Sequence, residues 1–256
     1  MVQQAPGFCE DRELTDRDLI DIGCSEEEAA RIAQLLSEEE LLDRYLSQGE
    51  KMDCTALPRV APGYPQVLQD RLGLDSPGVL WCKGDMSLLE KPMISLVGSR
   101  ELYSDNRRFA GAVGELAARL GCALVSGNAR GADSEAQESC LSHGGCVISV
   151  VADELCKAPV RKNVLYVAED GYDLHFSAIR ALSRNRVIHA LPRMTFVAQC
   201  SLERGGTWKG TTQNLRNYWS AVCCFNDGSA ASRALEKRGA VLIELDQLKP
   251  DLLPIL

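Results

Sequence analysis

The fold is decided by the stretch Met93-Ile94-Ser95-Leu96-Val97-Gly98-Ser99-Arg100. Its apolar run predicts a buried strand over residues 94–97, and a helical pattern follows over residues 105–120. Gly98 allows the tight turn between them. A strand, a turn and a helix in this order form the repeating unit of a parallel sheet. Backbone N–H groups at such a turn face a space where an anion can bind.

The same unit recurs through most of the chain. Further strands are predicted at 123–126, 147–151, 164–168, 195–198, 221–225 and 241–243, with helices at 133–142, 177–191, 207–219 and 229–238. The alternation predicts an α/β fold with a Rossmann-like, doubly wound and mostly parallel sheet. Ligands of such sheets bind beyond the carboxyl ends of the strands, where the strand order switches direction.

Three parts of the chain differ in composition. Residues 1–53 are expected to form a helical acidic region, in which Ser25 and Glu28 make a capping box. Prolines and glycines interrupt residues 54–90, which are interpreted as a linker and approach segment with one short strand at 79–82. Residues 91–256 are expected to form the Rossmann-like domain.

Charge is unevenly distributed along the chain. The formal net charge is −8, which taken alone argues against nucleic-acid binding. Residues 1–53 hold 15 acidic and 5 basic side chains, whereas residues 176–216 hold seven Arg or Lys and one Glu. The acidic part is interpreted mainly as a solvated helical surface. The basic part is interpreted as a binding face for a polyanion.

The composition also restricts which cofactors the protein can hold and in which compartment of the cell it is expected. There are 11 Cys and no C-x-x-C pair, a pattern that argues against a disulfide framework and against a zinc site. No apolar run reaches membrane-spanning length, and the N-terminus lacks the apolar region of a signal peptide. A cytoplasmic protein without a membrane partner, metal or cofactor is therefore expected.

The candidate binding residues follow the predicted strands or begin the predicted helices. Glycines permit close approach, and arginines offer a planar pair of donors to phosphate. Arg100 and Arg184 are expected to point at phosphate rather than into the core, and Phe176 is a candidate for stacking on a base. The full set of candidate phosphate- or nucleic-acid-binding residues is Gly98, Ser99, Arg100, Gly127, Arg130, Gly131, Phe176, Arg180, Arg184, Asn185, Arg186, Gly206, Thr207 and Lys209.

Several residues in these motifs have a structural interpretation as well. Asp133 is expected to cap the helix that follows it. Arg180 and Arg184 are four residues apart and share a helical face, whereas Arg186 points elsewhere, so one of the three arginines is a candidate for a structural salt bridge. Phe176 is equally compatible with a place in the core.

Catalytic chemistry is less evident than binding chemistry. The three histidines, His143, His175 and His189, do not occur in the context of a catalytic triad. The glycine-rich segment 205–211 lacks the Gly-Lys-Ser/Thr ending of a P-loop, and no full G-x-G-x-x-G fingerprint follows the first predicted strand of the parallel sheet. No catalytic residue is therefore predicted, and the chain is expected not to be an enzyme.

These motifs together resemble the DNA-processing protein A family, also called DprA or Smf. The shared features are the Gly98-Ser99-Arg100 turn, the turn from Ser126 to Asp133, and Arg184-Asn185-Arg186 with an upstream Phe176. The resemblance covers about residues 54–245. It implies binding of single-stranded DNA in DNA processing and recombination, with Arg100, Arg130, Phe176, Arg184 and Arg186 as contacts. It also implies a homodimer and the RecA recombinase as a partner, notably in natural transformation.

Two other functions stay open at this stage. Segment 204–211 is similar to the Pro-Gly-Gly-x-Gly-Thr turn of lysine-decarboxylase-like nucleoside monophosphate phosphoribohydrolases, but it lacks the Pro and the catalytic Glu that follows. A nucleotide-binding enzyme or sensor is therefore the main alternative. The third is a protein-interaction module led by the acidic helices.

Overall fold

The computed structural model describes residues 14–249, which fall into a helical unit ending at Gln48 and a larger unit beginning at Gly49. Three helices begin the described chain: α1 (Asp16–Asp21), α2 (Glu26–Leu36) and α3 (Glu39–Lys51), the last of which crosses that boundary. Ser25 caps α2 in the predicted capping box with Glu28. Thr15 and Asp18 form a second capping box at α1. The domain boundaries predicted after residues 53 and 90 stay predictions.

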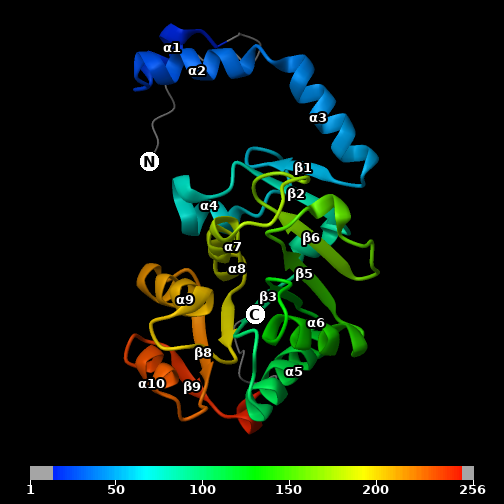
Figure 1. Ribbon diagram of the computed structural model, residues 1–256, viewed down its shortest axis with the longest axis vertical. Coiled ribbons are helices and arrows are strands. Elements are labelled where there is room, and N and C mark those ends of the chain that lie inside the picture. The colour runs from blue at the N-terminus through cyan, green and yellow to red at the C-terminus, as the bar shows by residue number, and fades with distance from the viewer. Residues whose placement is uncertain (1–13, 250–256) are drawn as a thin grey trace. The chain divides into compact units, whose positions relative to one another are not determined.

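A nine-stranded sheet organises the larger unit (Figure 1). Its strands are β1 (Thr55–Pro58), β2 (Val79–Gly84), β3 (Met93–Val97), β4 (Ala123–Ser126), β5 (Cys146–Val150), β6 (Val164–Ala168), β7 (Met194–Val197), β8 (Ala221–Phe225) and β9 (Val241–Ile243). They lie in the order β1-β2-β6-β5-β4-β3-β7-β8-β9. The pairs β1–β2 and β2–β6 are antiparallel, and all the other neighbouring pairs, from β6 to β9 in this order, are parallel. The predicted doubly wound, mostly parallel sheet is confirmed.

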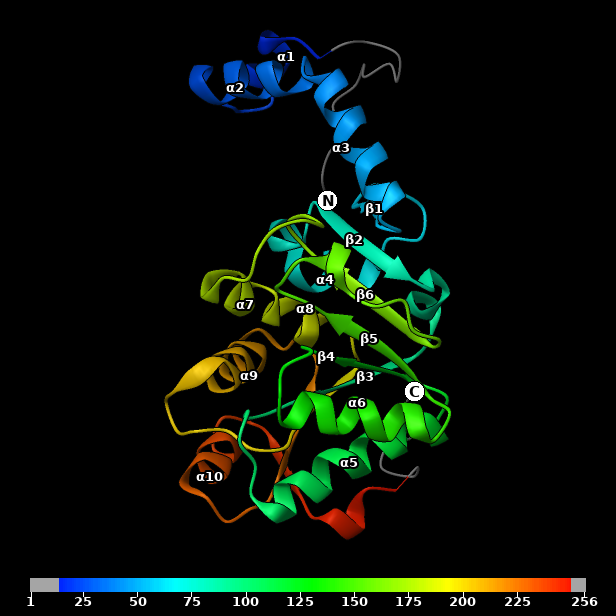
Figure 2. The same cartoon turned by 45° about the vertical axis from the view of Figure 1, so that its right-hand side comes forward.

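Helices cover the sheet on both faces. They are α4 (Gln66–Leu72), α5 (Ser104–Arg119), α6 (Ala132–Ser142), α7 (Ala178–Ser183), α8 (Asn185–Ala190), α9 (Gly205–Asn217) and α10 (Ala230–Glu236). Every residue of β3, β4, β5 and β6 is buried, as expected for strands with both faces covered. Helices α5 and α6 pack side by side and against β3 and β4 (Figure 2). Helices α9 and α10 connect β7, β8 and β9, which extend the sheet in the direction opposite to β4 and β5. Because such crossovers are right-handed, α9 and α10 lie on the face opposite to α5 and α6.

The strand order switches direction between β3 and β7. From β3 the chain proceeds through β4, β5 and β6 on one side, and β7, β8 and β9 follow on the other. Residues Ile94–Val97 of β3 pair in parallel with Met194–Val197 of β7. The loops that follow these two strands therefore emerge together at the carboxyl edge of the sheet, the predicted place for a ligand.

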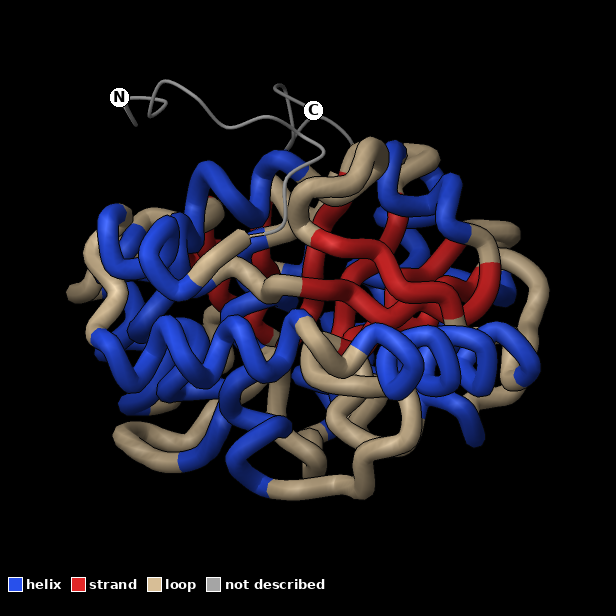
Figure 3. Tube along the Cα trace, turned by 90° about the horizontal axis from the view of Figure 1, so that it is seen from above, coloured by secondary structure: helices blue, strands red, loops and turns tan. Residues whose placement is uncertain are grey.

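Two segments differ from the sequence-based prediction. Only one short strand was expected in residues 54–90, but this segment supplies β1, α4 and a longer β2, which pairs with β6 and so is part of the sheet. The single helix expected over 177–191 is divided into α7 and α8 at Arg184. Figure 3 shows the chain from above, with the strands of the sheet in red and the helices in blue.

Candidate functional site

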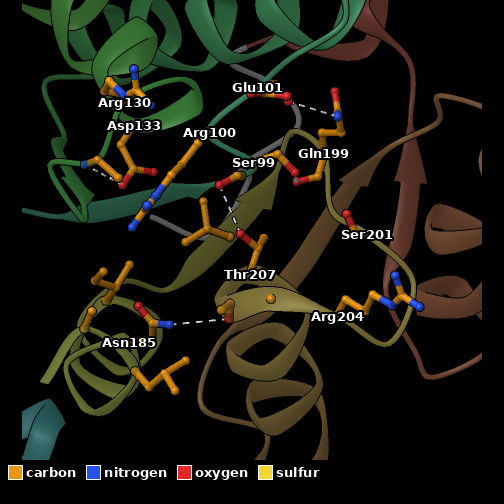
Figure 4. Close-up of a pocket in the computed structure, with 18 of the residues that line it drawn as sticks. Ser99, Arg100, Glu101, Arg130, Asp133, Asn185, Gln199, Ser201, Arg204 and Thr207 are labelled. Carbon is orange, nitrogen blue, oxygen red and sulfur yellow. Dashed lines mark hydrogen bonds between the residues drawn. The ribbon is translucent and has the colours of Figure 1, made fainter. Parts of the chain in front are cut away.

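A cavity of about 970 Å³ lies at the carboxyl ends of β3 and β7. The three motifs expected to meet there do meet, because residues from each of them line it (Figure 4). The predicted residues that line it are Gly98, Ser99, Arg100, Arg130, Phe176, Arg184, Asn185, Gly206 and Thr207. The predicted residues that do not line it are Gly127, Gly131, Arg180, Arg186 and Lys209.

The turn after β3 is held by backbone contacts on both sides. The Thr207 hydroxyl at the start of α9 donates to the carbonyl oxygen of Gly98 over 3.0 Å. The Ser99 N–H and hydroxyl both donate to the Gln199 carbonyl oxygen, at 2.9 and 3.2 Å. A Cβ at Gly98 would overlap the side chain of Ala132 on α6. Gly98 is thus required for packing between β3 and α6, a reason different from the predicted close approach of a ligand.

Gln199 shapes the rest of this loop and was missed by sequence reasoning. Its Oε1 accepts from the N–H of Tyr103 at 3.0 Å, and its Nε2 donates to the carbonyl oxygen of Glu101 at 3.1 Å (Figure 4). These partners lie almost a hundred residues away along the chain, so no local sequence signal marks the glutamine. Tyr103 also lines the cavity, with 74% of its side chain exposed.

Three exposed arginines line the cavity from different loops. Arg100 follows β3, Arg130 follows β4 and Arg204 precedes α9. Figure 4 shows Arg130 and Arg204 on opposite sides, with Arg100 extending between the loops. Arg204 was not predicted as a contact, although its place directly before Gly205-Gly206 was an available signal. The three guanidinium groups supply planar donors suited to phosphate.

The Asp133 side chain stabilises the turn after β4 by accepting hydrogen bonds from its backbone. Its Oδ2 accepts hydrogen bonds from the N–H groups of Gly127 and Ala129, both at 3.1 Å. The predicted cap role is wrong, because the N-cap of α6 is Gly131 and Asp133 lies inside the first turn. Burial raises the pKa of Asp133 to about 6, against the opposing effect of the Arg184 guanidinium.

Arg184 lies in the interior, although its side chain was expected to point to solvent and phosphate. Only 8% of it is exposed, and its Nη1 donates to the Val150 carbonyl oxygen at the end of β5 over 2.8 Å. Burial lowers the pKa of Arg184, while Asp133 and Glu169 oppose that effect. Among the described residues its buried Nε has no hydrogen-bond partner. The surface position predicted for Arg184 is therefore wrong, although the residue does border the cavity.

The glycines of the second turn serve internal packing. A Cβ at Gly127 would lie 2.5 Å from Cζ of Arg184. Gly131 has φ of +86°, and a Cβ there would lie 2.5 Å from the carbonyl oxygen of Ser99. Neither glycine borders the cavity, so close approach of a phosphate is not what these positions require.

Arg180 and Arg186 make structural contacts away from the cavity. Arg186 pairs with Glu169 at 2.9 Å and donates from Nε to the Asp75 carbonyl oxygen at 3.0 Å. The sequence suggested a structural salt bridge for one of Arg180, Arg184 and Arg186, and the structure shows one for Arg186 and one for Arg180. Arg180 pairs with Asp170 at 3.0 Å and donates to the carbonyl oxygens of three loop residues, Ala152, Leu174 and His175.

The part of the cavity lined by α7 and the residues just before it is apolar. Phe176, Ala178, Ala181 and Leu182 border the cavity, and 54% of Phe176 is exposed. Phe176 is therefore not a core residue. Ser177 caps α7 by accepting from the N–H of Arg180 at 3.1 Å. No side chain of α7 is buried, so Arg180 and this cap hold the segment in place more than apolar packing does.

The cavity offers few groups that could act as a general acid or base near neutral pH. His189 borders it but is 1% exposed, and burial lowers its pKa to about 3, so that the ring is neutral. Its Nδ1 lies 3.2 Å from Nδ2 of Asn214, which makes it the acceptor in that pair. Within residues 14–249 no group of three His, Cys, Asp or Glu is placed to hold a metal ion.

The helices are too short or too polar to cross a lipid bilayer; this holds for all those in the described part of the chain.

Comparison with known proteins identifies relatives for most of the chain. A family model described as DNA recombination-mediator protein A matches residues 56–247. Protein Smf of Escherichia coli is 27% identical over 183 residues, which cover 66% of this chain and 49% of that protein. DNA processing protein DprA of Streptococcus pneumoniae is 29% identical over 196 residues, which cover 68% of this chain and 66% of that protein. The chain thus spans about half of the first relative and just under two thirds of the second.

Solved structures share the fold. The structure of DprA from Streptococcus pneumoniae aligns with a TM-score of 0.76 and 23% identity, covering 96% of this chain and 87% of that one. DNA processing protein A from Helicobacter pylori, whose structure is described in terms of its single-stranded DNA binding mode, aligns with a TM-score of 0.63 and 20% identity, covering 76% and 92%.

Proposed function

The chain belongs to the DNA recombination-mediator protein A family, and on that basis we propose that it binds single-stranded DNA in DNA processing and recombination. The cavity at the switch point between β3 and β7 is the proposed binding site. Its contacts are Arg100, Arg130 and Arg204 for phosphate and Phe176 for a base.

One observation carries this proposal: the same cavity is lined by three exposed arginines and by an apolar segment that includes the exposed ring of Phe176. The exposed arginines offer charged donors to a phosphate backbone, and the segment around Phe176 offers an aromatic face. A single strand presents phosphates and unstacked bases at the same time. A duplex keeps its bases stacked inside, so its phosphates can contact the arginines but its bases cannot reach Phe176. The site therefore favours single strands with little sequence preference.

The relatives support the same proposed function, binding of single-stranded DNA. The Helicobacter pylori protein is described as binding single-stranded DNA, and the Streptococcus pneumoniae relative is a DNA processing protein. A role in natural transformation, with RecA as a partner and the protein acting as a homodimer, is part of the proposal through the family alone.

We further propose that binding occurs without chemistry. The acidic side chains that border the cavity are Glu101 and Asp133, and the Asp133 carboxylate already accepts two backbone hydrogen bonds. His189 is neutral at physiological pH, and helix α9 contains no carboxylate. A phosphoribohydrolase needs a positioned acid or base near the reacting group, which the cavity supplies poorly. Glu203 is an acidic residue just before the glycines that begin α9. Release of base from AMP and from cytokinin-type monophosphates by purified protein, abolished by Glu203→Gln, would contradict this proposal.

The decisive experiment is a salt series of binding curves with a single-stranded oligonucleotide and with the same sequence as a duplex. Affinity for the single strand is expected to be higher and to fall steeply with salt, because phosphate contacts release counterions. Arg100→Ala should weaken binding with an unchanged melting temperature. Arg108→Ala is the matched control, since Arg108 is an exposed arginine on α5 outside the cavity. Absence of binding at low salt, or equal affinity for duplex, would refute the proposed function.

A further inference from the structure

Helix α9 carries a basic stripe that continues outward from the cavity. Gly205, Lys209 and Arg216 are spaced four and seven residues apart, so they lie on one face of the helix. All three are exposed, and Gly205 itself borders the cavity. The opposite face is buried and contains Trp208, Thr211 and Asn214. From Gly205 to Arg216 the stripe extends about 16 Å along the helix axis.

No negative charge balances this stripe. Helix α9 contains no Asp or Glu over its whole length, Gly205–Asn217. Within the described chain neither Lys209 nor Arg216 takes part in an ion pair. On α5, by contrast, two exposed arginines are paired within their own helix, Arg108 with Asp105 and Arg119 with Glu115. The stripe begins at the rim of the proposed phosphate site, and its two cations, Lys209 and Arg216, are unpaired. It is therefore complementary in charge to a polyanion that extends out of that site.

We propose that a DNA strand held in the cavity continues along α9, where Lys209 and Arg216 contact backbone phosphates outside the cavity. This inference rests on the proposed function and extends it from a single cavity to a track. Between the two cations lie the half-buried Thr212 and the exposed Gln213, which are polar and uncharged. The bases of a strand there would meet no charged group that selects one base over another. The track therefore adds affinity for longer strands without adding sequence preference.

The test compares strand lengths in a charge-matched pair of double variants. Lys209→Ala/Arg216→Ala removes the two cations of the track. Arg108→Ala/Arg119→Ala removes two cations from α5, which packs against β3 and β4, away from α9. Each variant and the wild type are titrated with oligothymidylates of about four and about fifteen nucleotides, the range over which single-strand sites extend.

The track variant should bind the long strand about tenfold more weakly than the control variant, with the salt slope reduced by about 1.4, twice the value per phosphate on a single strand. The two double variants should bind the short strand equally. All four substituted side chains are exposed, so melting temperatures should agree with wild type and rule out unfolding.

The other outcomes separate the two proposals. Equal affinities and salt slopes of both variants on the long strand would overturn the track while leaving the cavity site standing. An equal loss on short and long strands would also overturn it, because Lys209 and Arg216 would then act on the cavity itself. If the wild type bound neither strand, the proposed function would fail, and the track with it.

Discussion

The guanidinium group of Arg184 lies directly against the backbone of Gly127, in the space that a side chain at residue 127 would need. The arginine comes from the junction of α7 and α8, and the glycine from the turn after β4. Asp133 binds the same turn through the N–H of Gly127 and acts electrostatically on Arg184. The two buried charged residues that border the cavity, Arg184 and Asp133, are therefore held by a glycine behind them that does not border it.

Gly127→Ala should destabilise the protein by about 1–3 kcal/mol, the usual cost of overpacking a filled interior. The added methyl group would overlap the Arg184 guanidinium and force it away from the Val150 carbonyl oxygen. Urea unfolding of purified protein measures the change. Gly111→Ala on α5 is the control, since its Cβ would meet only Oε1 of Glu135 at 3.7 Å. It should stabilise the helix by up to about 1 kcal/mol, and a Gly127→Ala variant as stable as that control would contradict the packing described.

Arg184→Ala should cost on the order of 3 kcal/mol of stability, because it leaves buried Asp133 without its neighbouring positive charge. Arg100→Ala should change stability by less than about 0.5 kcal/mol, since Arg100 is exposed. Both variants should lose DNA affinity, but only Arg184→Ala should lower the melting temperature. Equal melting temperatures for the two variants would show that Arg184 is a surface contact after all.

The stability conferred by Asp133 should increase as the pH falls. Its pKa is raised from 3.8 to about 6 in the folded protein, so folding favours the protonated form. That contribution is complete below about pH 4 and is lost as the pH rises through 6, with a total size of up to about 3 kcal/mol. Asp133→Asn does not titrate. The free energy of unfolding of wild type minus that of this variant should therefore increase between pH 7.5 and pH 5, and a constant difference would disprove the raised pKa.

Phe176→Ala should weaken binding of single-stranded DNA by about 1–3 kcal/mol, the value of one base stacked on an aromatic ring. Stability should not change, because more than half of the side chain is exposed. Ile179→Ala serves as control: Ile179 is 80% exposed on α7, the helix that follows Phe176, and does not border the cavity. The affinity of both variants is measured with the same oligonucleotide. Equal affinities would remove Phe176 from the site.

Sequence patterns were sufficient to predict the parallel part of the sheet. Each of its strands is a short apolar run followed by a glycine or polar turn, and these signals are local. The same reasoning placed the turns after β3 and β4 and the start of α9 at one edge, because parallel topology brings those ends together. The edge strand β1 was missed, since Thr55–Pro58 contains a proline and only one of its four residues is buried.

The roles of individual arginines were not predictable in the same way. Arg180, Arg184 and Arg186 are close in sequence and look alike as phosphate donors. Their partners decide their roles, and those partners are the carbonyl oxygens of Val150, Leu174 and Asp75 and the carboxylates of Asp170 and Glu169. Several of these lie far away along the chain, so the division into one buried and two structural arginines needs tertiary structure. Arg204 became a candidate once the hydrogen bond from Thr207 to Gly98 showed that the start of α9 lies at the end of β3.

Helix α7 is the part of the site with the weakest attachment to the rest of the protein. It buries no side chain, and the ion pair and hydrogen bonds of Arg180 connect it to the loop that precedes it and to Ala152 after β5. Local opening of α7 should therefore require much less free energy than global unfolding, so its amide protons should exchange with solvent ahead of those in β3 or β4. A protease should cut the chain near Ile179 while the sheet stays intact. Because Phe176 directly precedes this helix, such a cut would remove the stacking segment and leave the arginines in place, giving a protein that no longer distinguishes single strands from duplex.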